Sequence, residues 1–376
     1  MKHMLIKGDN IQCINFLLKE RKLKGKIDLI YIDPPFATNS NFTITDGRAS
    51  TMSNSRNGNI AYSDKLIGKD FIEFLRNRLI LLKDLLSGQG SIYLHIDYKI
   101  GHYVKVMMDE VFGIENFRND ITRIKCNPKN FNRLAYGNIK DLILFYTKSS
   151  KPIWNEPREK YTEKDIEKLF PKTDKQGRRY TTVPIHAPGE TENGKSNQPF
   201  KGIMPPKGRH WRTDVETLDQ WDKEGLIEWS STGNPRKIIF ADERKGKRVQ
   251  DIWEYKNPQY PSYPTEKNSE LLDLIIRTSS NPESIILDCF CGSGTTLKSA
   301  HLLGRQWIGI DQSHHAIKAT IEKLETIKGD LFMSKPEYEL IDIEKNETHN
   351  KSLNMSAPCY GNRNCSGEPG YRVSYQ

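Results

Sequence analysis

The sequence predicts an α/β fold built on a mostly parallel, twisted sheet, and three observations predict it. Short apolar runs suited to buried strands alternate with longer segments whose apolar residues recur at helical spacing. A glycine-bearing loop follows one of these runs, and a stiff turn with two prolines follows another. At 376 residues, the chain is long enough for one large domain with an insertion or for two domains.

The strands and helices are expected in two separate parts of the chain. The predicted strands are residues 27–32 (IDLIYI), 91–96, 142–146, 284–287 and 307–310. Helices are predicted over residues 71–86, 100–111, 270–279 and 295–303. We expect Gly88 and Gly90 to end the first helix, and Gly304 to end the last.

Composition changes in the middle of the chain. Residues 151–256 are rich in Pro, Gly, Lys and Arg and hold five of the six tryptophans, with weak hydrophobic periodicity. A separate small domain or long insertion is therefore predicted there. The sequence divides into residues 1–150, the insertion 151–256, residues 257–335, and a polar tail, 345–376, that we expect to be flexible.

Charge and composition narrow the function classes. A formal charge of +9 favours a polyanionic partner, although many basic proteins bind none. The longest apolar runs, such as Leu79 to Leu82, are far too short to span a bilayer, and the N-terminus lacks the order of a secretion signal. Six scattered cysteines fit a reducing compartment, so we expect a protein of the cytoplasm.

A glycine loop lies near the C-terminal end of the second α/β part. Residues 285–311 combine a strand, a loop with Gly292 and Gly294, a helix, and a strand that ends in Asp311. Such a loop lets a ligand approach the backbone, and an acidic residue about 20 positions later can accept hydrogen bonds from ribose hydroxyls. Glycine also serves tight turns for steric reasons alone. The flanking elements and Asp311 favour a nucleoside-bearing cofactor.

Two phosphate-binding alternatives fit this loop less well. A phosphate-cradling loop would have a lysine directly after its last glycine, where this chain has Thr295 and Thr296. A dinucleotide fold would have a third glycine where this chain has Leu297.

The sequence Asp33-Pro34-Pro35-Phe36 directly follows the predicted strand 27–32. This places a carboxylate and an aromatic ring at the carboxyl end of a parallel strand, where open α/β sheets bind ligands. Asp33 and the Pro34 carbonyl can accept both hydrogens of an exocyclic amine, and Phe36 can stack on a base. A rigid strand-to-loop turn with a surface aromatic is an equally good account of these residues alone.

Together, these motifs resemble the amino-methyltransferases of restriction–modification systems. Asp33 to Phe36 matches their catalytic motif, and Asp288 to Gly294 (DCFCGSG) matches their cofactor motif. The catalytic motif comes first, with a basic region between the two, as in the permuted β class. Residues 263–267 (YPTEK) and Gly8-Asp9 match further segments of that class, and the likeness extends to the modification subunits of type III systems.

The resemblance implies a Rossmann-like methyltransferase fold and methyl transfer from S-adenosylmethionine to the N6 amino group of adenine in double-stranded DNA, after base flipping. It implies four catalytic-motif residues: Asp33, Pro34, Pro35 and Phe36. The cofactor residues that it implies are Asp9, Thr265, Asp288, Phe290, Gly292, Gly294, Thr295 and Asp311. Asp at the first position of the catalytic motif favours adenine. N4-cytosine or RNA methylation, and a catalytically silent nucleic-acid-binding subunit, remain as alternatives.

The same resemblance assigns partners. Residues 151–256 would be the target-recognition region, although a solvated basic surface explains any single lysine or arginine there equally well. A cognate restriction endonuclease subunit and a second copy of the chain are expected partners, and a membrane is not.

The polar segment 39–59 is expected to be a loop, which either closes on DNA or has no role. Cys289 and Cys291 are spaced too closely for usual zinc ligation, so no metal is expected.

Overall fold

The computed structural model divides into two compact units: Met1–Asn155 with Asp251–Gln376, and Glu156–Gln250. The described residues are 2–34, 41–45, 48–50, 59–63, 68–128, 134–189, 194–259, 266–328 and 335–344, of which 41–45, 48–50 and 59–63 are described as backbone only. Pro35, Phe36, Thr265 and the predicted flexible tail, 345–376, lie outside them.

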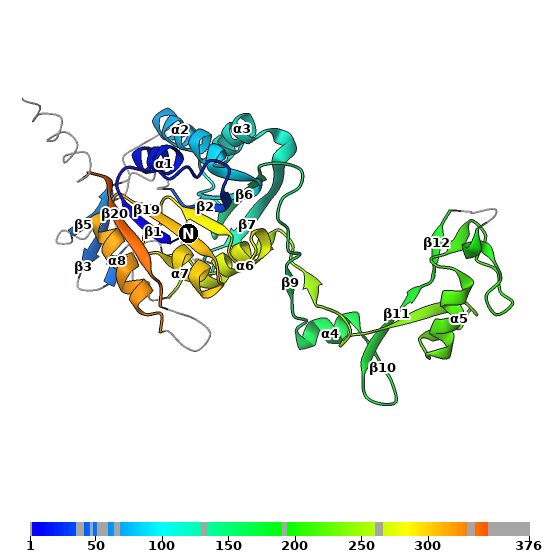
Figure 1. Ribbon diagram of the computed structural model, residues 1–376. Helices are drawn as coiled ribbons and strands as arrows, with labels where there is room; N and C mark the ends of the chain where they lie inside the picture. Colours follow the sequence, from blue (N-terminus) through cyan, green and yellow to red (C-terminus); the bar gives the residue numbers. More distant parts are fainter. Residues whose placement is uncertain are drawn as a thin grey trace, which may run out of the picture. The chain divides into compact units, whose positions relative to one another are not determined.

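The first unit is built on a nine-stranded sheet (Figure 1). In spatial order, its strands are β17 (Ile252–Trp253), β7 (Phe117–Ile124), β8 (Lys140–Thr147), β6 (Leu86–Ile96), β2 (Ile27–Ile32), β18 (Ile285–Asp288), β19 (Gln306–Asp311), β1 (His3–Lys7) and β20 (Tyr338–Asp342). Neighbouring strands are parallel except at β8, which runs antiparallel to β6 and β7. The predicted mostly parallel, Rossmann-like α/β fold is confirmed.

Helices cover both faces of this sheet. On one face lie α1 (Asn10–Lys19), α2 (Lys69–Leu85) and α3 (Gly101–Phe112), and on the other lie α6 (Ser269–Ser279), α7 (Thr295–Leu302) and α8 (His314–Glu325) (Figure 1). The central strand β2 is therefore apolar along nearly its whole length, and Ile27, Leu29, Ile30 and Ile32 are fully buried. A strand covered on both faces needs apolar residues at consecutive positions rather than alternating ones.

The prediction that Gly88 and Gly90 end the first helix was wrong. Helix α2 ends at Leu85, and β6 begins at the next residue and runs through both glycines. A Cβ on Gly90 would lie 2.9 Å from the Ile27 carbonyl oxygen of the neighbouring strand. Gly90 therefore allows the close approach of two strands at the register shift between Ile27 and Leu29.

The expected loop over residues 39–59 was also wrong in part. The described backbone there forms an antiparallel sheet in the order β4 (Arg48–Ser50), β3 (Asn41–Thr45), β5 (Asn59–Ser63). Residues 39–40, 46–47 and 51–58 lie outside the described residues.

The second unit has a four-stranded antiparallel sheet. Its strands are β10 (Lys172–Thr173), β11 (Arg179–Pro184), β15 (Pro235–Phe240) and β14 (Ile227–Trp229). Its other elements are β9 (Arg158–Glu159), β12 (His186–Pro188), β13 (Arg209–Trp211), β16 (Lys247–Arg248), α4 (Glu163–Leu169) and α5 (Val215–Lys223). A small core holds Ile185, Phe200, Trp211 and Leu218. Such short strands leave little hydrophobic periodicity in the sequence.

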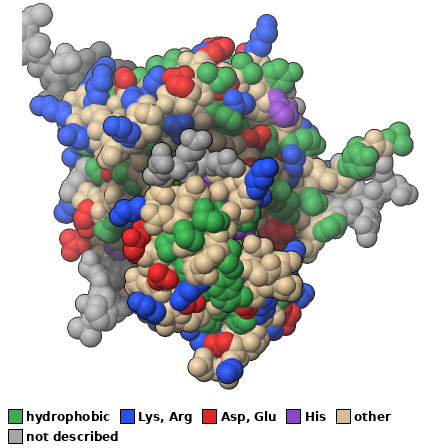
Figure 2. All heavy atoms as spheres, turned by 90° about the vertical axis from the view of Figure 1, so that its right-hand side faces the viewer, with side chains coloured by type: hydrophobic (Ala, Val, Ile, Leu, Met, Phe, Trp, Pro, Cys, Tyr) green, Lys and Arg blue, Asp and Glu red, His purple; other side chains and the backbone are tan. Residues whose placement is uncertain are grey.

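Several basic residues of the second unit are bound internally. Arg178 pairs with Asp242 and Glu243, and Lys237 lies over the Trp221 ring with Nζ 3.3 Å from its centroid. In Figure 2, Lys and Arg side chains are spread over the visible face and interspersed with Asp and Glu. Other basic residues of this unit are exposed: Lys207, Arg209, Arg212, Arg244 and Lys245.

No helix among the described residues is both long enough and apolar enough to cross a membrane.

The core of the first unit makes a stability prediction. Leu79 is fully buried in α2, whereas its neighbour Ile80 is 49% exposed. We expect Leu79→Ala to lower the free energy of unfolding by about 2–5 kcal/mol, because it removes buried methyl groups and leaves a cavity. Ile80→Ala, the control, should change it by about 0.5 kcal/mol or less. Urea unfolding followed by circular dichroism measures both, and equal losses would contradict this packing.

Candidate active site

Aspartates lie at the carboxyl ends of the parallel strands. Asp9 follows β1, Asp33 follows β2, Asp97 follows β6, and β18 and β19 end in Asp288 and Asp311. Because these strands are parallel, all five residues lie along one edge of the sheet.

Strands β2 and β18 are direct neighbours, paired at Leu29–Ile286 and Ile30–Leu287. From β18 the chain continues through α7 to β19 on one side, and from β2 through α2 to β6 on the other. This is the point where strand order reverses, the usual ligand site of open α/β sheets. The Asp33 turn and the glycine loop, distant in sequence, therefore start side by side.

Asp288 holds the glycine loop from within. Its carboxylate accepts hydrogen bonds from the Phe290 amide (3.0 Å) and from the Thr296 hydroxyl (2.6 Å). Burial raises the pKa of Asp288 to about 7, although these hydrogen bonds oppose the rise. Phe290 packs toward Phe74 of α2, with ring centroids 6.3 Å apart.

The two loop glycines have left-handed backbones, with φ of 52° at Gly292 and 75° at Gly294. The Thr320 hydroxyl of α8 donates to the Gly292 carbonyl at 2.9 Å. A Cβ on Gly294 would lie 2.7 Å from Cγ2 of the same threonine. Gly294 thus satisfies both the backbone conformation at the start of α7 and the close packing against α8.

Asp311 links the end of β19 to this loop. Its carboxylate accepts from the Gly292 amide (3.0 Å) and from the Ser313 amide (2.8 Å). Burial raises the pKa of Asp311 to about 6, again against the effect of these hydrogen bonds. Neither Asp288 nor Asp311 has an ion-pair partner among the described residues.

Asp9 caps α1 by accepting from the Ile11 and Gln12 amides, and it forms a 3.0 Å ion pair with Arg78 of α2. The next residue, Asn10, donates to the carbonyl of Cys289. The start of α1 is therefore tied directly to the loop that follows β18.

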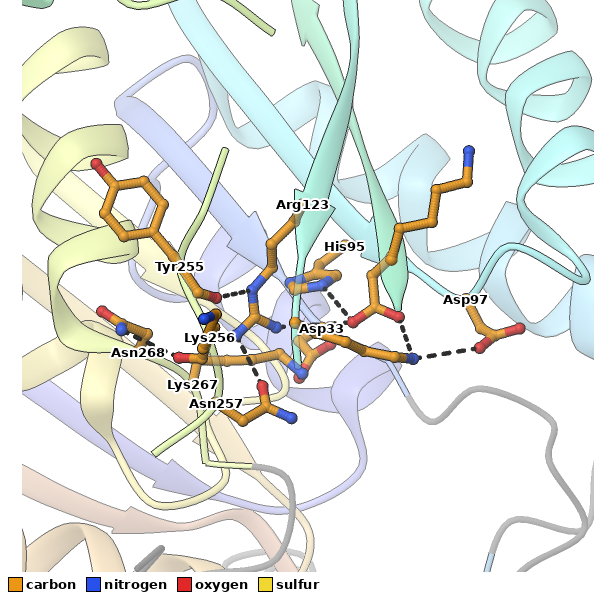
Figure 3. Close-up of polar contacts among 12 residues, drawn as sticks. Asp33, His95, Asp97, Arg123, Tyr255, Lys256, Asn257, Lys267 and Asn268 are labelled. Atoms are coloured by element: carbon orange, nitrogen blue, oxygen red, sulfur yellow. Dashed lines mark hydrogen bonds and ion pairs between the residues drawn. The ribbon is translucent and has the colours of Figure 1, made fainter. Parts of the chain in front are cut away.

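Asp33 has one engaged and one open carboxylate oxygen. Its Oδ2 lies 2.6 Å from Nζ of Lys267, and the side chain is only 15% exposed (Figure 3). Its Oδ1 is buried and has no hydrogen-bond partner within the described part of the chain. An unsatisfied buried acceptor is costly, and a ligand donor would satisfy it. Pro34 is buried beside it.

A buried polar network lies beside Asp33. His95 of β6 contacts the Tyr31 hydroxyl through Nδ1 (2.9 Å) and Asp141 through Nε2 (3.3 Å). Burial lowers the pKa of His95 to about 4, so at neutral pH its Nε2–H donates and its Nδ1 accepts. Lys125 reaches Asp141 at 2.6 Å and Asp97 at 3.9 Å. Burial opposes ionisation of Asp141, but bonds from His95 and Lys125 hold its pKa well below its usual range.

Thr295 belongs to a polar cluster around Lys323 of α8. The Lys323 ammonium donates to Ser293 and Thr295 hydroxyls, both at 2.9 Å, and to the Glu266 carboxylate. The roles of Lys267, Lys323 and Glu266 were not predicted from the sequence. Residues 263–267 were identified only by their resemblance to a segment of the β class. The three-residue spacing of Thr320 and Lys323 was the one signal in the sequence for a polar face of α8.

Among the residues with described positions, no group of three or more His, Cys, Asp or Glu could hold a metal ion. Cys289 and Cys291 are buried and pack as small apolar residues.

Many enzymes share an α/β fold with a ligand site at the point where strand order reverses. Comparison with known proteins shows to which family of enzymes this chain belongs. The family model N6/N4 Mtase, described as DNA methylase, matches residues 27–322. The chain belongs to this DNA methylase family. It is 41% identical to type II methyltransferase M.EcaI of Enterobacter cloacae over 86% of this chain and 69% of that protein.

One more distant relative is longer than this chain. The chain is 25% identical to the probable type III restriction-modification enzyme HindVI Mod subunit of Haemophilus influenzae, covering 87% of this chain and 50% of that subunit. It thus spans about half of that relative. A solved structure, the M1.HpyAVI–SAM complex, aligns with a TM-score of 0.44 at 16% identity, over 85% of this chain and 98% of that chain.

The glycine loop makes a prediction with a matched control. Gly294 and Gly304 have nearly the same φ, 75° and 74°, but nothing lies within 4 Å of a Cβ on Gly304. Gly304→Ala should cost about 1–2 kcal/mol of unfolding free energy from left-handed strain alone. Gly294→Ala should cost more, because its methyl group also meets Thr320. Denaturant titration compares them, and equal costs would show that the loop does not pack against α8 as described.

Proposed function

We propose that the chain transfers a methyl group from S-adenosylmethionine to the N6 amino group of adenine in double-stranded DNA. The observation that carries this proposal is the buried, unsatisfied Oδ1 of Asp33, one strand away from the glycine loop. Oδ1 of Asp33 can accept a hydrogen bond from an amine. An amine bound there would lie next to a methyl donor held by the glycine loop. Family membership and the 41% identity to a named methyltransferase support the reaction type.

The glycine loop fits this cofactor by its charge. Asp288 and Asp311 carry raised pKa values because of burial, and their partners are amides and a hydroxyl rather than cations. When it is ionised, the Asp311 carboxylate would repel a phosphate, and a ligand with positive charge would compensate it. When bound, S-adenosylmethionine supplies a methyl group on a positively charged sulfur that departs as a neutral thioether.

We assign the following residues to cofactor binding: Asp9, Thr265, Asp288, Phe290, Gly292, Gly294, Thr295 and Asp311. Asp311 would accept hydrogen bonds from the ribose hydroxyls. Gly292 and Gly294 would let the cofactor lie against the backbone. Asp288 and Asp9 act indirectly, since their carboxylates hold the loop and the start of α1 in place.

Asp33 and Pro34 would activate the amine. An aromatic amine is a poor nucleophile because its lone pair is delocalised into the ring. Oδ1 of Asp33 would accept one amine hydrogen and the Pro34 carbonyl the other, which favours tetrahedral nitrogen and localises the pair. Oδ1 would also receive the proton that the nitrogen loses after it gains the methyl group. Phe36 would stack on the flipped base, offsetting about 1–3 kcal/mol of the cost of flipping.

Base specificity follows from the first motif residue. Asp33 leans toward adenine N6, whereas serine there would lean toward cytosine N4. We further propose that residues 151–256 read the DNA sequence, with exposed lysines and arginines contacting phosphates. A relative is named as the Mod subunit of a restriction-modification enzyme, which supports a restriction endonuclease as a partner of this chain. We also propose that the chain forms a homodimer and acts in the cytoplasm.

Tritium transfer tests the activity. Wild-type protein should move label from S-[methyl-³H]adenosylmethionine to duplex DNA, and nucleoside analysis should find it in N6-methyladenine. Asp33→Ala should lower the rate about 100-fold or more, because the amine loses an acceptor aligned with the methyl donor. Its cofactor affinity should stay within about threefold of wild type. Label in N4-methylcytosine or in RNA would support the alternatives, and full turnover by Asp33→Ala would remove Asp33 from catalysis.

Cofactor binding should depend on pH through Asp311. The carboxylate is the better acceptor for ribose hydroxyls, and it is ionised above its pKa of about 6. Affinity for S-adenosylmethionine should therefore fall as the pH drops below 6, by about tenfold per unit well below the pKa. Calorimetry from pH 5 to 8 measures this. Asp311→Asn should bind more weakly and lose the dependence near pH 6, leaving only what Asp288 contributes. A flat wild-type profile would contradict the ribose role.

A further inference from the structure

We propose that the consecutive residues Glu266 and Lys267, together with Lys323, form a positioning clamp that holds the catalytic carboxylate and the glycine loop at a fixed separation. Lys267 holds Asp33, and Glu266 holds the loop through Lys323. The clamp rests on the proposed function and deepens it, since it acts on the alignment of amine and methyl donor.

The first arm is the pair of Lys267 and Asp33. Nζ and Oδ2 are 2.6 Å apart, and the side chains are 10% and 15% exposed. A charge pair this far out of water is costly to break, because breaking it leaves a buried charge uncompensated. It fixes Oδ2 and so fixes the direction of the second oxygen, Oδ1, which is the open acceptor.

The second arm runs from Glu266 to the loop. Lys323 and Glu266 are 12% and 15% exposed, and the ammonium also donates to Ser293 and Thr295. An ammonium has three hydrogens, and these three acceptors can use all of them. Lys323 therefore joins Glu266 to both ends of the Ser293–Thr295 turn. Burial lowers the pKa of Lys323, and the Glu266 carboxylate opposes this change.

The two arms are short and share a rigid base. Glu266 and Lys267 are adjacent, so their Cα atoms are about 3.8 Å apart. The following residue, Asn268, caps α6 by accepting from the Glu270 amide at 2.8 Å, and donates to the Lys256 carbonyl at 3.1 Å (Figure 3). A displacement of Asp33 or of the glycine loop would strain the ion pair or the hydrogen bonds that hold it. Misplacement of reacting groups by about 1 Å can cost about 100-fold in rate.

The test separates positioning from stability and from cofactor binding. Lys267→Met keeps the length of the side chain and removes the charge. It should lower kcat about 100-fold while calorimetric affinity for S-adenosylmethionine stays within about threefold. Lys267→Arg keeps a cation and should restore about tenfold of the loss. Lys298→Met is the matched control. Lys298 lies on α7 next to the loop, and among the residues with described positions its ammonium donates to the Thr326 hydroxyl alone, in a solvent-exposed bond. This variant should leave kcat unchanged.

The second arm is tested by Glu266→Gln, which should weaken calorimetric binding of S-adenosylmethionine about tenfold, since Lys323 loses its counter-charge. In Lys267→Met/Glu266→Gln, a clamp that works as a unit predicts a loss of kcat/KM smaller than the product of the single losses. Thermal unfolding of every variant checks the fold.

Three results would overturn the clamp: unchanged kcat in Lys267→Met, losses in the double variant that multiply, or equal losses in Lys298→Met. Each leaves the proposed function standing if the wild-type protein methylates adenine. Wild-type protein that transfers no methyl group would instead defeat the proposed function. The clamp would then also fail as an alignment device, whatever the binding data.

Discussion

The pairing of β2 with β18 is the constraint on which the rest of the site depends. Their parallel register brings the Asp33 turn and the glycine loop to one edge, although about 260 residues separate them in sequence. Helices α2 and α7 leave these strands in opposite directions and cover opposite faces (Figure 1). The edge between these two helices is where an open α/β sheet can admit two substrates at once.

The carboxylates along this edge divide into two groups by their partners. Asp9, Asp33 and Asp97 have cationic neighbours: Arg78, Lys267 and Lys125. Asp288 and Asp311 are held by amides and a hydroxyl, and burial raises their pKa values. Along the edge, Asp288 and Asp311 lie between compensated carboxylates on both sides, because Asp33 follows β2 and Asp9 follows β1. In the proposed function, the Asp33 turn receives the neutral base, and the glycine loop receives the positively charged methyl donor.

Periodicity predicted the central part of the fold well. Strand β2 occupies residues 27–32 as predicted, since a strand buried on both faces is a continuous apolar run. Periodicity did not predict the structure where contacts between distant residues determine it. Gly90 is an example, because its place in β6 depends on the close approach of Ile27. The roles of Lys267 and Lys323 could not be predicted either. Both are ordinary lysines in sequence, and only the fold brings their ammonium groups to Asp33 and to the loop hydroxyls. Asp288, assigned to the cofactor, has its carboxylate engaged inside the loop.

The central claim is that one edge binds a methyl donor and an amine next to each other. A bisubstrate analogue, in which the adenosine of the cofactor is joined through a short linker to N6 of adenine, tests it most directly by calorimetry. The account predicts binding about 100-fold or more tighter than that of S-adenosylmethionine, with the gain lost in Asp33→Ala. Binding no tighter than that of the cofactor, or a gain that survives in Asp33→Ala, would contradict it.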